Sequence, residues 1–425
     1  MVAVHIMEVS GALKGFESAG LDTFLRFHSR KMSDRVVIVE ITDQDYESQD
    51  LFQGKSPLKR ELLADLVSSI QTYDPAVIAM DFDTRSKDWC QLNPALPANI
   101  LPEKSNSPQH PVIWAEIPAN IEEPLHLSPV LGGRLLDPRY VGIPRFPVDS
   151  DGLVRRYEEE FSVTGSLQDC SSEPVHPTDI PEGEQHLSAT GARDIFPSFA
   201  RAILDQACKR GVPCSSLRQE RHEPVIFNFY GDRYRFPIIQ SHEFIGPAAA
   251  KSLPESNDLH AQRTALFHNK IVLIGGNFSA ARDIYMTPLG PMAGVELIAL
   301  AIESDFGGGI REAQRWYEMF ADFFVADLIV FLYYYYRRRP RVALLTSLFG
   351  IPLLAAFFSW LLFQSVAYWF NFMPIIIGMV LHQMLELSES CTELQKEVER
   401  LESRALLPPQ DKVEAPLAEQ QKPQP

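Results

Sequence analysis

The chain has 425 residues, a formal net charge of −16 and an isoelectric point near 5.2. This acidic balance argues against nucleic-acid binding, which needs clustered positive charge. About 310 residues precede an apolar C-terminal stretch, which leaves room for one large domain or two small ones.

The N-terminal residues 1–34 predict a helical lead-in. Within residues 15–29, Leu21, Phe24, Leu25 and Phe27 supply a partial apolar face, which is typical of a short amphipathic helix. The lead-in has no secretory apolar core of about 7 to 15 residues and no cleavage site. If this part is exported, we therefore expect a further membrane span encoded upstream of Met1.

A strand, a helix and a second strand follow the lead-in. Residues 35–41 are apolar and β-branched, residues 56–73 repeat leucines at helical spacing, and residues 76–80 are apolar again. This order predicts a βαβ unit whose two strands are parallel, with a right-handed crossover. We expect an α/β sensory domain over residues 35–310, with a mixed sheet and flanking helices.

Acidic residues follow both strands. Asp43 comes after the first strand, and Asp81 and Asp83 come after the second. Because ligands of open α/β sheets bind at the carboxyl ends of the strands, these side chains are candidates for one crevice. Asp is also common in turns for local hydrogen-bonding reasons, so capping is the alternative. We add Asp283 and Glu296 to the candidate ligand-binding set.

Further strands are predicted towards the end of the domain. Residues 224–230 and 234–238 predict a hairpin around a Gly-Asp turn. Residues 270–276 predict a buried strand that ends in two glycines, and a helix starts at Gly294. The glycine pair lacks the Lys and Ser or Thr of a phosphate-binding loop, so a tight turn is the better interpretation.

The cysteine pattern argues against a zinc site, because no CxxC is present. The five cysteines are Cys90, Cys170, Cys208, Cys214 and Cys391. An oxidising compartment permits bridges among the first four, with Cys208 and Cys214 the nearest pair, and free buried thiols are equally compatible. His242 has no second ligand at metal spacing and is interpreted as a surface or turn histidine. We expect no metal, no cofactor and no catalytic residue.

The apolar stretch predicts three membrane-spanning helices of about 20 residues each. We place them at residues 316–336, 342–363 and 366–385. The first two are separated by four arginines: Arg337, Arg338, Arg339 and Arg341. The positive-inside rule puts this cluster in the cytoplasm, so the domain lies outside an inner (plasma) membrane and the C-terminus inside. Asp322 and Asp327 weaken the first span, for which a buried or interfacial helix is the alternative.

The tail continues as a short coiled coil over residues 386–406, and residues 407–425 are disordered by composition. Apolar positions alternate by fours and threes: Val380, Met384, Leu387, Cys391, Leu394, Val398, Leu401 and Ala405. This heptad seam predicts an unbroken helix and a homodimer through residues 380–405. A single exposed amphipathic helix is the alternative.

The order of these motifs resembles the second type of CHASE domain (cyclase and histidine-kinase associated sensory extracellular) over roughly residues 20–305. The matching segments are residues 21–26, the strand ending near Asp43, the helix start at 56–60, Met80-Asp81-Phe82, the Asp-Gly-x-x-Arg-Arg turn at 151–156, the strand at 270–275, the Asp-x-x-x-Thr-Pro loop at 283–288 and the Gly-Val-Glu start at Gly294. Three spans after the domain also fit the family. The family normally has an N-terminal span and often an output module, whereas only about 40 residues follow the last span here, too few for a kinase or cyclase.

The resemblance implies a bacterial membrane sensor and not an enzyme. We expect the outer domain to bind an unknown small ligand or protein and to relay its state to a separate cytoplasmic partner. A structural or scaffold envelope protein is the first alternative. A metal-dependent enzyme that uses the candidate carboxylates is a weaker one.

Overall fold

The computed structural model describes residues 13–27, 34–84, 110–120, 123–127, 138–164, 194–214, 224–229, 236–246, 257–307, 309–312, 320, 323–324, 327–328, 331, 334–336, 342 and 345–405. The chain divides into two compact units. The α/β unit comprises residues 14–318 and 357–371, and the helical unit comprises residues 1–13, 319–356 and 372–425.

A six-stranded sheet in the order β10-β1-β11-β2-β3-β5 forms the centre of the α/β unit. Its strands are β1 (Val36–Ile41), β2 (Val77–Asp81), β3 (Val112–Ala115), β5 (Val141–Gly142), β10 (Ile238–Gln240) and β11 (Ile271–Gly276). All neighbouring strands in this sheet are parallel, so the prediction of a mixed sheet is wrong. Strands that are apolar along their whole length are typical of parallel sheets buried on both faces. The predicted βαβ unit is confirmed as parallel, with β11 inserted between β1 and β2.

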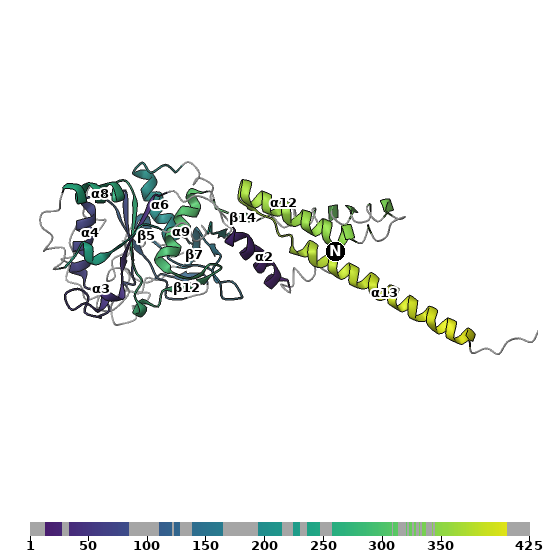
Figure 1. Ribbon diagram of the computed structural model, residues 1–425. Helices are drawn as coiled ribbons and strands as arrows, with labels where there is room; N and C mark the ends of the chain where they lie inside the picture. Colours follow the sequence, from purple (N-terminus) through teal and green to yellow (C-terminus); the bar gives the residue numbers. More distant parts are fainter. Residues whose placement is uncertain are drawn as a thin grey trace, which may run out of the picture. The chain divides into compact units, whose positions relative to one another are not determined.

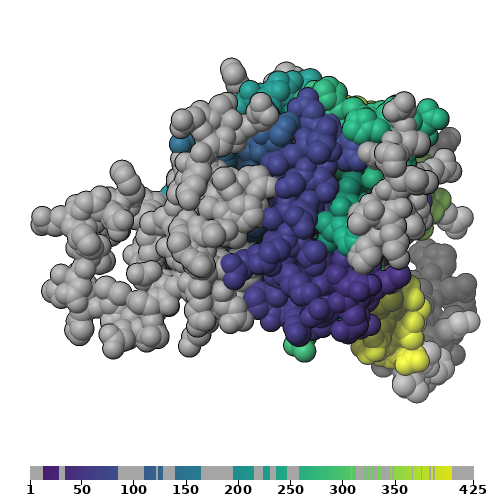
Figure 2. Space-filling model, turned by 90° about the vertical axis from the view of Figure 1, so that its left-hand side faces the viewer, coloured from purple at the N-terminus to yellow at the C-terminus, as the bar shows by residue number. Residues whose placement is uncertain are grey.

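Helices cover both faces of this sheet, as Figure 1 shows. One face carries α3 (Asp43–Glu47), α4 (Arg60–Gln71) and α8 (Asn257–Phe267), and the other carries α6 (Phe199–Lys209) and α9 (Gly294–Phe306). Figure 2 views the unit from the side of α4, where the segment that holds α3 and α4 runs down the middle of the face.

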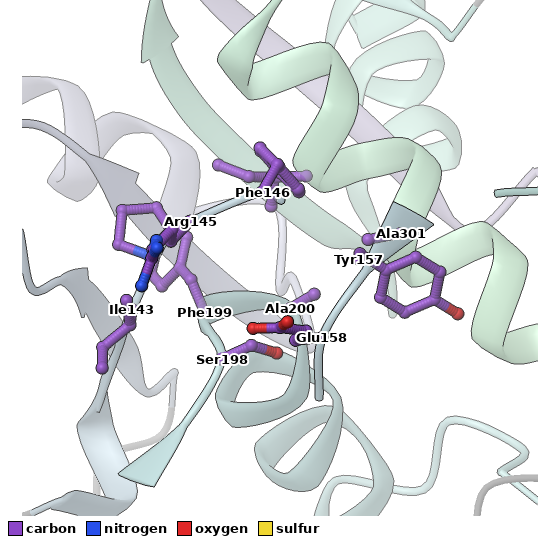
Figure 3. Close-up of a pocket in the computed structure, with 11 residues that line it drawn as sticks. Ile143, Arg145, Phe146, Tyr157, Glu158, Ser198, Phe199, Ala200 and Ala301 are labelled. Atoms are coloured by element: carbon purple, nitrogen blue, oxygen red, sulfur yellow. The ribbon is translucent and has the colours of Figure 1, made fainter. Parts of the chain in front are cut away.

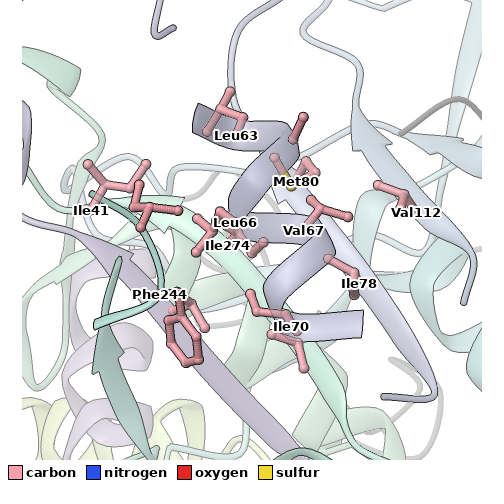
Figure 4. Packing of buried hydrophobic residues seen from close by; sticks show 14 of the residues in the cluster. Ile41, Leu63, Leu66, Val67, Ile70, Ile78, Met80, Val112, Phe244 and Ile274 are labelled. Atoms are coloured by element: carbon pink, nitrogen blue, oxygen red, sulfur yellow. The ribbon is translucent and has the colours of Figure 1, made fainter. Parts of the chain in front are cut away.

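The core between α4 and the sheet follows from the leucine spacing in the sequence. The apolar side chains that α4 buries there are Leu63, Leu66, Val67 and Ile70. They belong to one cluster with Ile78, Met80 and Ile274 of the strands (Figure 4). Full burial of each such side chain contributes about 1.5 to 3 kcal/mol, so this layer is a main source of stability.

Smaller sheets surround the main one and hold the antiparallel pairs. They are formed by β4 (Leu125–His126), β7 (Glu160–Thr164) and β8 (Asp194–Pro197), by β6 (Arg156–Tyr157) and β9 (Val225–Ile226), by β12 (Ile284–Thr287) and β13 (Gly290–Ala293), and by β14 (Arg311–Glu312) and β15 (Tyr368–Trp369). The predicted hairpin over residues 224–230 and 234–238 is wrong. Its first strand, β9, pairs with β6, and its second, β10, pairs in parallel with β1, while the expected turn lies outside the described residues.

A buried arginine fastens the lead-in helix α2 (Lys14–Arg26) to the domain. Arg155, which is 1 % exposed, donates through Nε to Asp22 Oδ1 at 2.6 Å and through Nη2 to Asp22 Oδ2 at 2.8 Å. It also donates to Asp149 Oδ2 at 2.9 Å and to Asp151 Oδ2 at 2.7 Å. Burial alone would lower the pKa of Arg155, but these carboxylates outweigh it and raise the pKa. The bond from Arg155 lowers the pKa of Asp151 to about 2.

The C-terminal helices differ in their bounds from the predicted spans. A π-helical turn at Thr346–Gly350 leads into α12 (Ile351–Val366, 16 residues). The helix α13 (Met373–Ala405, 33 residues) starts at Met373 instead of Val366, because Tyr368 and Trp369 form β15 with β14. Among the described residues, no helix combines the length and the apolar character that a membrane crossing requires. Most of the first predicted span and the four arginines lie outside these residues.

Two further predictions concern the cysteines and the tail. Cys208 and Cys214 form a disulfide with a Cα–Cα distance of 5.7 Å, which confirms the nearest pair. Cys90 and Cys170 lie outside the described residues. Cys391 is free and exposed on α13, which runs through residues 380–405 as one helix, as the heptad seam predicts.

Replacing Arg155 by Met tests the role of the buried guanidinium. The change leaves Asp22, whose side chain is 16 % exposed, without its counter-charge, whereas Asp149 keeps its ion pair with Arg156. Removing one partner of a buried ion pair typically costs about 3 to 5 kcal/mol. We expect a loss of that size in the free energy of unfolding, measured by urea denaturation of the full chain. Lys270→Met is the control, because its partner Asp34 is 88 % exposed and such pairs contribute at most about 1 kcal/mol. Equal losses in both variants would contradict the assignment.

Candidate functional site

The register of the parallel sheet places two carboxylates on either side of a glycine. Gly275 of β11 is paired with Glu40 of β1 and with Asp81 of β2. Residues paired directly across neighbouring strands have side chains on the same face of the sheet. An added Cβ on Gly275 would lie 2.7 Å from Val295 Cβ, so this is the face on which α9 packs. Glycine here allows α9 to approach the sheet between the two acids.

Two more carboxylates lie at the first turn of α9, one against the helix and one on it. An added Cβ on Gly294 would overlap the Asp283 carboxylate, which therefore rests directly against the start of the helix. Gly294 N also donates to Asp283 O at 2.9 Å. Glu296 Oε2 accepts from Ala293 N at 3.1 Å and closes the turn. Helix N-termini favour negative charge, which partly stabilises this arrangement. We refer to Glu40, Asp81, Asp283 and Glu296 as the carboxylate cluster.

Burial and mutual repulsion disturb the ionisation of the cluster. Burial raises the pKa of Asp81 well above its usual value, and the charge of Asp283 adds to the effect. Burial likewise raises the pKa of Asp283, against a hydrogen bond with Tyr285. Burial and the charges of both acids raise the pKa of Tyr285. Two carboxylates in such proximity cannot both ionise at low cost, so the pair favours holding a proton.

Glu40 joins the cluster from the other side of Gly275. Burial raises its pKa, the amide of Asn277 opposes this by donating to Glu40 Oε1, and the charge of Glu296 raises it further. Glu40 was not among the candidates predicted from the sequence. The sequence pattern could have indicated it, because Glu40 is the single charged residue in the apolar run of β1.

The candidate residues from the sequence separate into two groups. Asp81 and Asp283 interact at the start of α9, where Glu296 caps the first turn and interacts with Glu40. Asp43 instead accepts from Ser279 N at 2.8 Å and from Ser279 Oγ at 3.0 Å, so it caps the turn after β11. Asp83 is exposed, two residues beyond the end of β2.

His242 is held at the same end of the sheet by a buried acid. Its Nδ1 lies 2.7 Å from Asp45 Oδ1, and Ser241 Oγ donates to Asp45 Oδ2 at 3.0 Å. Asp45 is 1 % exposed and also accepts from Thr42 N at 3.2 Å at the start of α3. The histidine therefore fastens a turn, as the sequence indicated.

A small cavity lies on the α6 and α9 side of the unit, where Arg145, Glu158 and Ser198 are part of its lining (Figure 3). Its volume of about 10 Å³ is close to the room that one water molecule needs. Arg145 Nη1 is buried there without a hydrogen-bond partner. Burial, and then the charge of Glu123, raises the pKa of Glu158.

The chemistry of the carboxylate cluster is that of proton exchange and of attraction to positive charge. Within the described ranges, no three His, Cys, Asp or Glu side chains are placed to hold a metal ion together. The cluster lies at the carboxyl ends of parallel strands, where open α/β sheets bind their ligands.

Comparison with known proteins gives one match. A family model described as the CHASE2 domain matches residues 1–333 of the chain. No curated protein and no solved structure matches it. The matched region contains the Arg155 turn, the Asp283 loop and the start of α9, so the structure gives a physical role to each of these sequence motifs.

Asp81→Asn tests the ionisation of the cluster. Because the folded protein raises the pKa of Asp81, it binds more protons than the unfolded chain, and this contribution to stability is present below the unfolded pKa near 4. It is lost as the pH rises through the folded pKa. We therefore expect Asp81→Asn to be more stable than the wild type near pH 7, with the difference closing towards pH 4. Thermal unfolding across this range measures it.

Asp50→Asn is the matched control, because Asp50 is exposed and outside the cluster. A pH profile of Asp81→Asn that runs parallel to those of Asp50→Asn and the wild type would refute the coupling.

Proposed function

Because the chain belongs to the CHASE2 domain family, whose members are sensory domains, we propose that it is a membrane-anchored sensor. The α/β unit faces the extracytoplasmic side and binds a small ligand or a protein. The C-terminal helices relay the bound state to a separate cytoplasmic signalling partner. The chain has no enzymatic role in this proposal.

The carboxylate cluster is the input site in this proposal. The observation that carries it is the placement of like charges together: Glu40 and Asp81 flank Gly275, and the Asp283 carboxylate lies against Gly294. The raised pKa of Asp81 and Asp283 agrees with this, because a fold that keeps repelling carboxyls together loses stability by doing so. Such perturbed groups are typical of functional sites. Their chemistry favours a ligand that presents positive charge, such as an amine or a guanidinium, and the same acids respond to protons.

Exposed apolar side chains support the membrane anchor over residues 316–385. Large apolar side chains that are exposed in this stretch include Phe320, Phe323, Phe324, Phe331, Leu345, Phe349, Leu353, Phe357, Phe358, Leu361, Met384 and Leu385. Soluble surfaces rarely expose so many large apolar side chains in one stretch of sequence, whereas lipid accepts them. The cytoplasmic placement of the four arginines rests on the positive-inside rule.

The disulfide supports the extracytoplasmic placement of the α/β unit. Cys208 and Cys214 are bridged at the C-terminal end of α6. Disulfides persist in oxidising compartments and are rare in the cytosol of mesophiles.

The output element is α13, which we propose to pair with a second copy of the chain. Its heptad positions present exposed apolar side chains: Val380, Met384, Leu394, Val398 and Leu401. An apolar seam at this spacing is buried when two helices form a coiled coil. The homodimer through residues 380–405 would then be the unit that a cytoplasmic partner recognises.

Oxidative crosslinking at Cys391 tests the dimer. Cys391 occupies a seam position, so two copies bring their sulfurs close enough for a disulfide in a paired helix. We expect a covalent dimer of the full chain on mild oxidation in isolated membranes. The matched control is Cys391→Ser/Lys396→Cys, which moves the thiol to the outer face of the helix. Monomers alone, or equal crosslinking of both proteins, would end the relay proposal.

Protease accessibility tests the topology. We expect protease added to intact spheroplasts to cut the α/β unit and leave residues 386–425 intact, because the membrane shields the cytoplasmic side. Inverted vesicles should reverse the pattern. An epitope added at the C-terminus reports whether the tail remains uncut. Protection of the α/β unit in spheroplasts would contradict the proposed orientation.

A further inference from the structure

The lead-in helix α2 contacts both the turn at the end of β12, the strand that follows Asp283, and the turn that precedes α13. We propose that α2 is the element through which the state of the carboxylate cluster reaches this turn, residues 363–371, which we name the docking turn. The inference rests on the proposed sensor function and specifies its internal route. Every contact in the route lies within the α/β unit.

The first step joins the carboxylate cluster to α2 through β12. Asp283 is followed directly by β12, which ends at Thr287. The next residue, Pro288, accepts through its carbonyl oxygen from Arg26 Nε at 3.3 Å. Thr287 Oγ1 donates to Gly290 O at 2.7 Å and stiffens this end of the hairpin. A shift of the Asp283 loop therefore acts on the last residue of α2.

A second connection runs through the buried arginine. Val154 N donates to Met286 O at 2.8 Å, so the turn that carries Arg155 is hydrogen-bonded to β12. Arg155 in turn holds Asp22 of α2 with two short bonds. Paired charge-assisted bonds of this kind are specific in direction, so α2 follows the orientation of the arginine.

The opposite side of α2 contacts the docking turn through aromatic rings. Phe24 lies edge-on to Phe363, with ring centroids 5.6 Å apart, and edge-on to Trp369 at 5.1 Å. The three side chains are 7 %, 0 % and 4 % exposed, respectively. The docking turn is also tied to the domain by Arg311 N, which donates to Ala367 O at 2.9 Å. The chain enters α13 at Met373, two residues after the docking turn.

The two faces of α2 make different kinds of contact. Asp22 and Arg26 are four residues apart and share one face of the helix, whereas Phe24 falls on the opposite face. The polar face makes directional bonds to the domain, and the aromatic contacts opposite it tolerate sliding because apolar packing is non-directional. Helix shifts of about 1 to 2 Å are a common means of switching. A shift of α2 would therefore repack Phe363 and Trp369.

Hydrogen exchange of the full chain tests the route. The input is Asp283→Asn, which replaces the carboxyl by an uncharged amide. The readout is the hydrogen-exchange rate of the backbone amides of residues 363–372. Coupling between sites is typically about fivefold or more, so we expect at least about a fivefold change in this rate. The same input in an Arg26→Gln background should give a smaller change in this rate, because only the connection through Arg155 and Asp22 remains. Lys14→Gln is the matched control, with the same charge change at the exposed other end of α2, and it should keep the full response.

Two results would overturn the inference. One is an equal response in the Arg26→Gln and Lys14→Gln backgrounds. The other is a change in amides 283–296 without any change in amides 363–372. Phe24→Leu gives an independent check that keeps an apolar side chain but removes the aromatic ring, and it should also suppress the response at the docking turn.

The readouts separate this route from the proposed function. Crosslinking at Cys391 tests the dimer, and we expect it to persist in Arg26→Gln. A failure of the exchange experiment with intact crosslinking would remove the route through α2 alone. A failure of crosslinking would remove the relay proposal itself.

Discussion

The guanidinium of Arg155 is almost fully removed from water, and the structure must supply the carboxylates that compensate its charge. Asp149 and Asp151 come from the neighbouring turn, but Asp22 comes from a helix more than 130 residues earlier in the chain. This requirement helps to fix α2 against the rest of the α/β unit, together with the buried Leu21 and Leu25. It also fixes the position of Phe24 on the other face of α2, where this ring packs against Phe363 and Trp369. The contact between the N-terminal helix and the docking turn therefore depends on one buried charge.

The carboxylate cluster is the electrostatic opposite of that site. At Arg155, unlike charges meet and each stabilises the other. Around Gly275 and Gly294, like charges meet, and burial makes the repulsion stronger because little solvent screens it. Two glycines make the crowding possible by letting the first turn of α9 approach the sheet. An arrangement that opposes stability at the ligand-binding edge of a parallel sheet is consistent with the sensory role of the CHASE2 family.

The C-terminal part of the chain presents a different physical problem, since its helices bury little of their apolar surface on themselves. Phe349, Leu353 and Phe358 are exposed on the helical stretch that ends at Val366, and Leu394 and Leu401 are exposed near the end of α13. These apolar surfaces are removed from water only by contact with lipid or with another polypeptide chain. In our proposal, lipid covers the first group and a second copy of α13 covers the second.

Local patterns in the sequence determined the buried strands, the parallel βαβ unit, the continuous helix α13 and the family resemblance, whereas the Cys208–Cys214 bridge was only one of the possibilities that they left open. Each depends on neighbouring residues, whose spacing and burial preferences can be counted along the chain. Only the tertiary structure decided that β10 pairs with β1, that β15 pairs with β14, and that Glu40 stands beside Asp81 across Gly275. Strand register and the approach of helices to a sheet are set by packing between distant segments. Asp43 and Asp283 therefore looked alike in sequence, although one caps a turn and the other joins the half-buried carboxylate cluster.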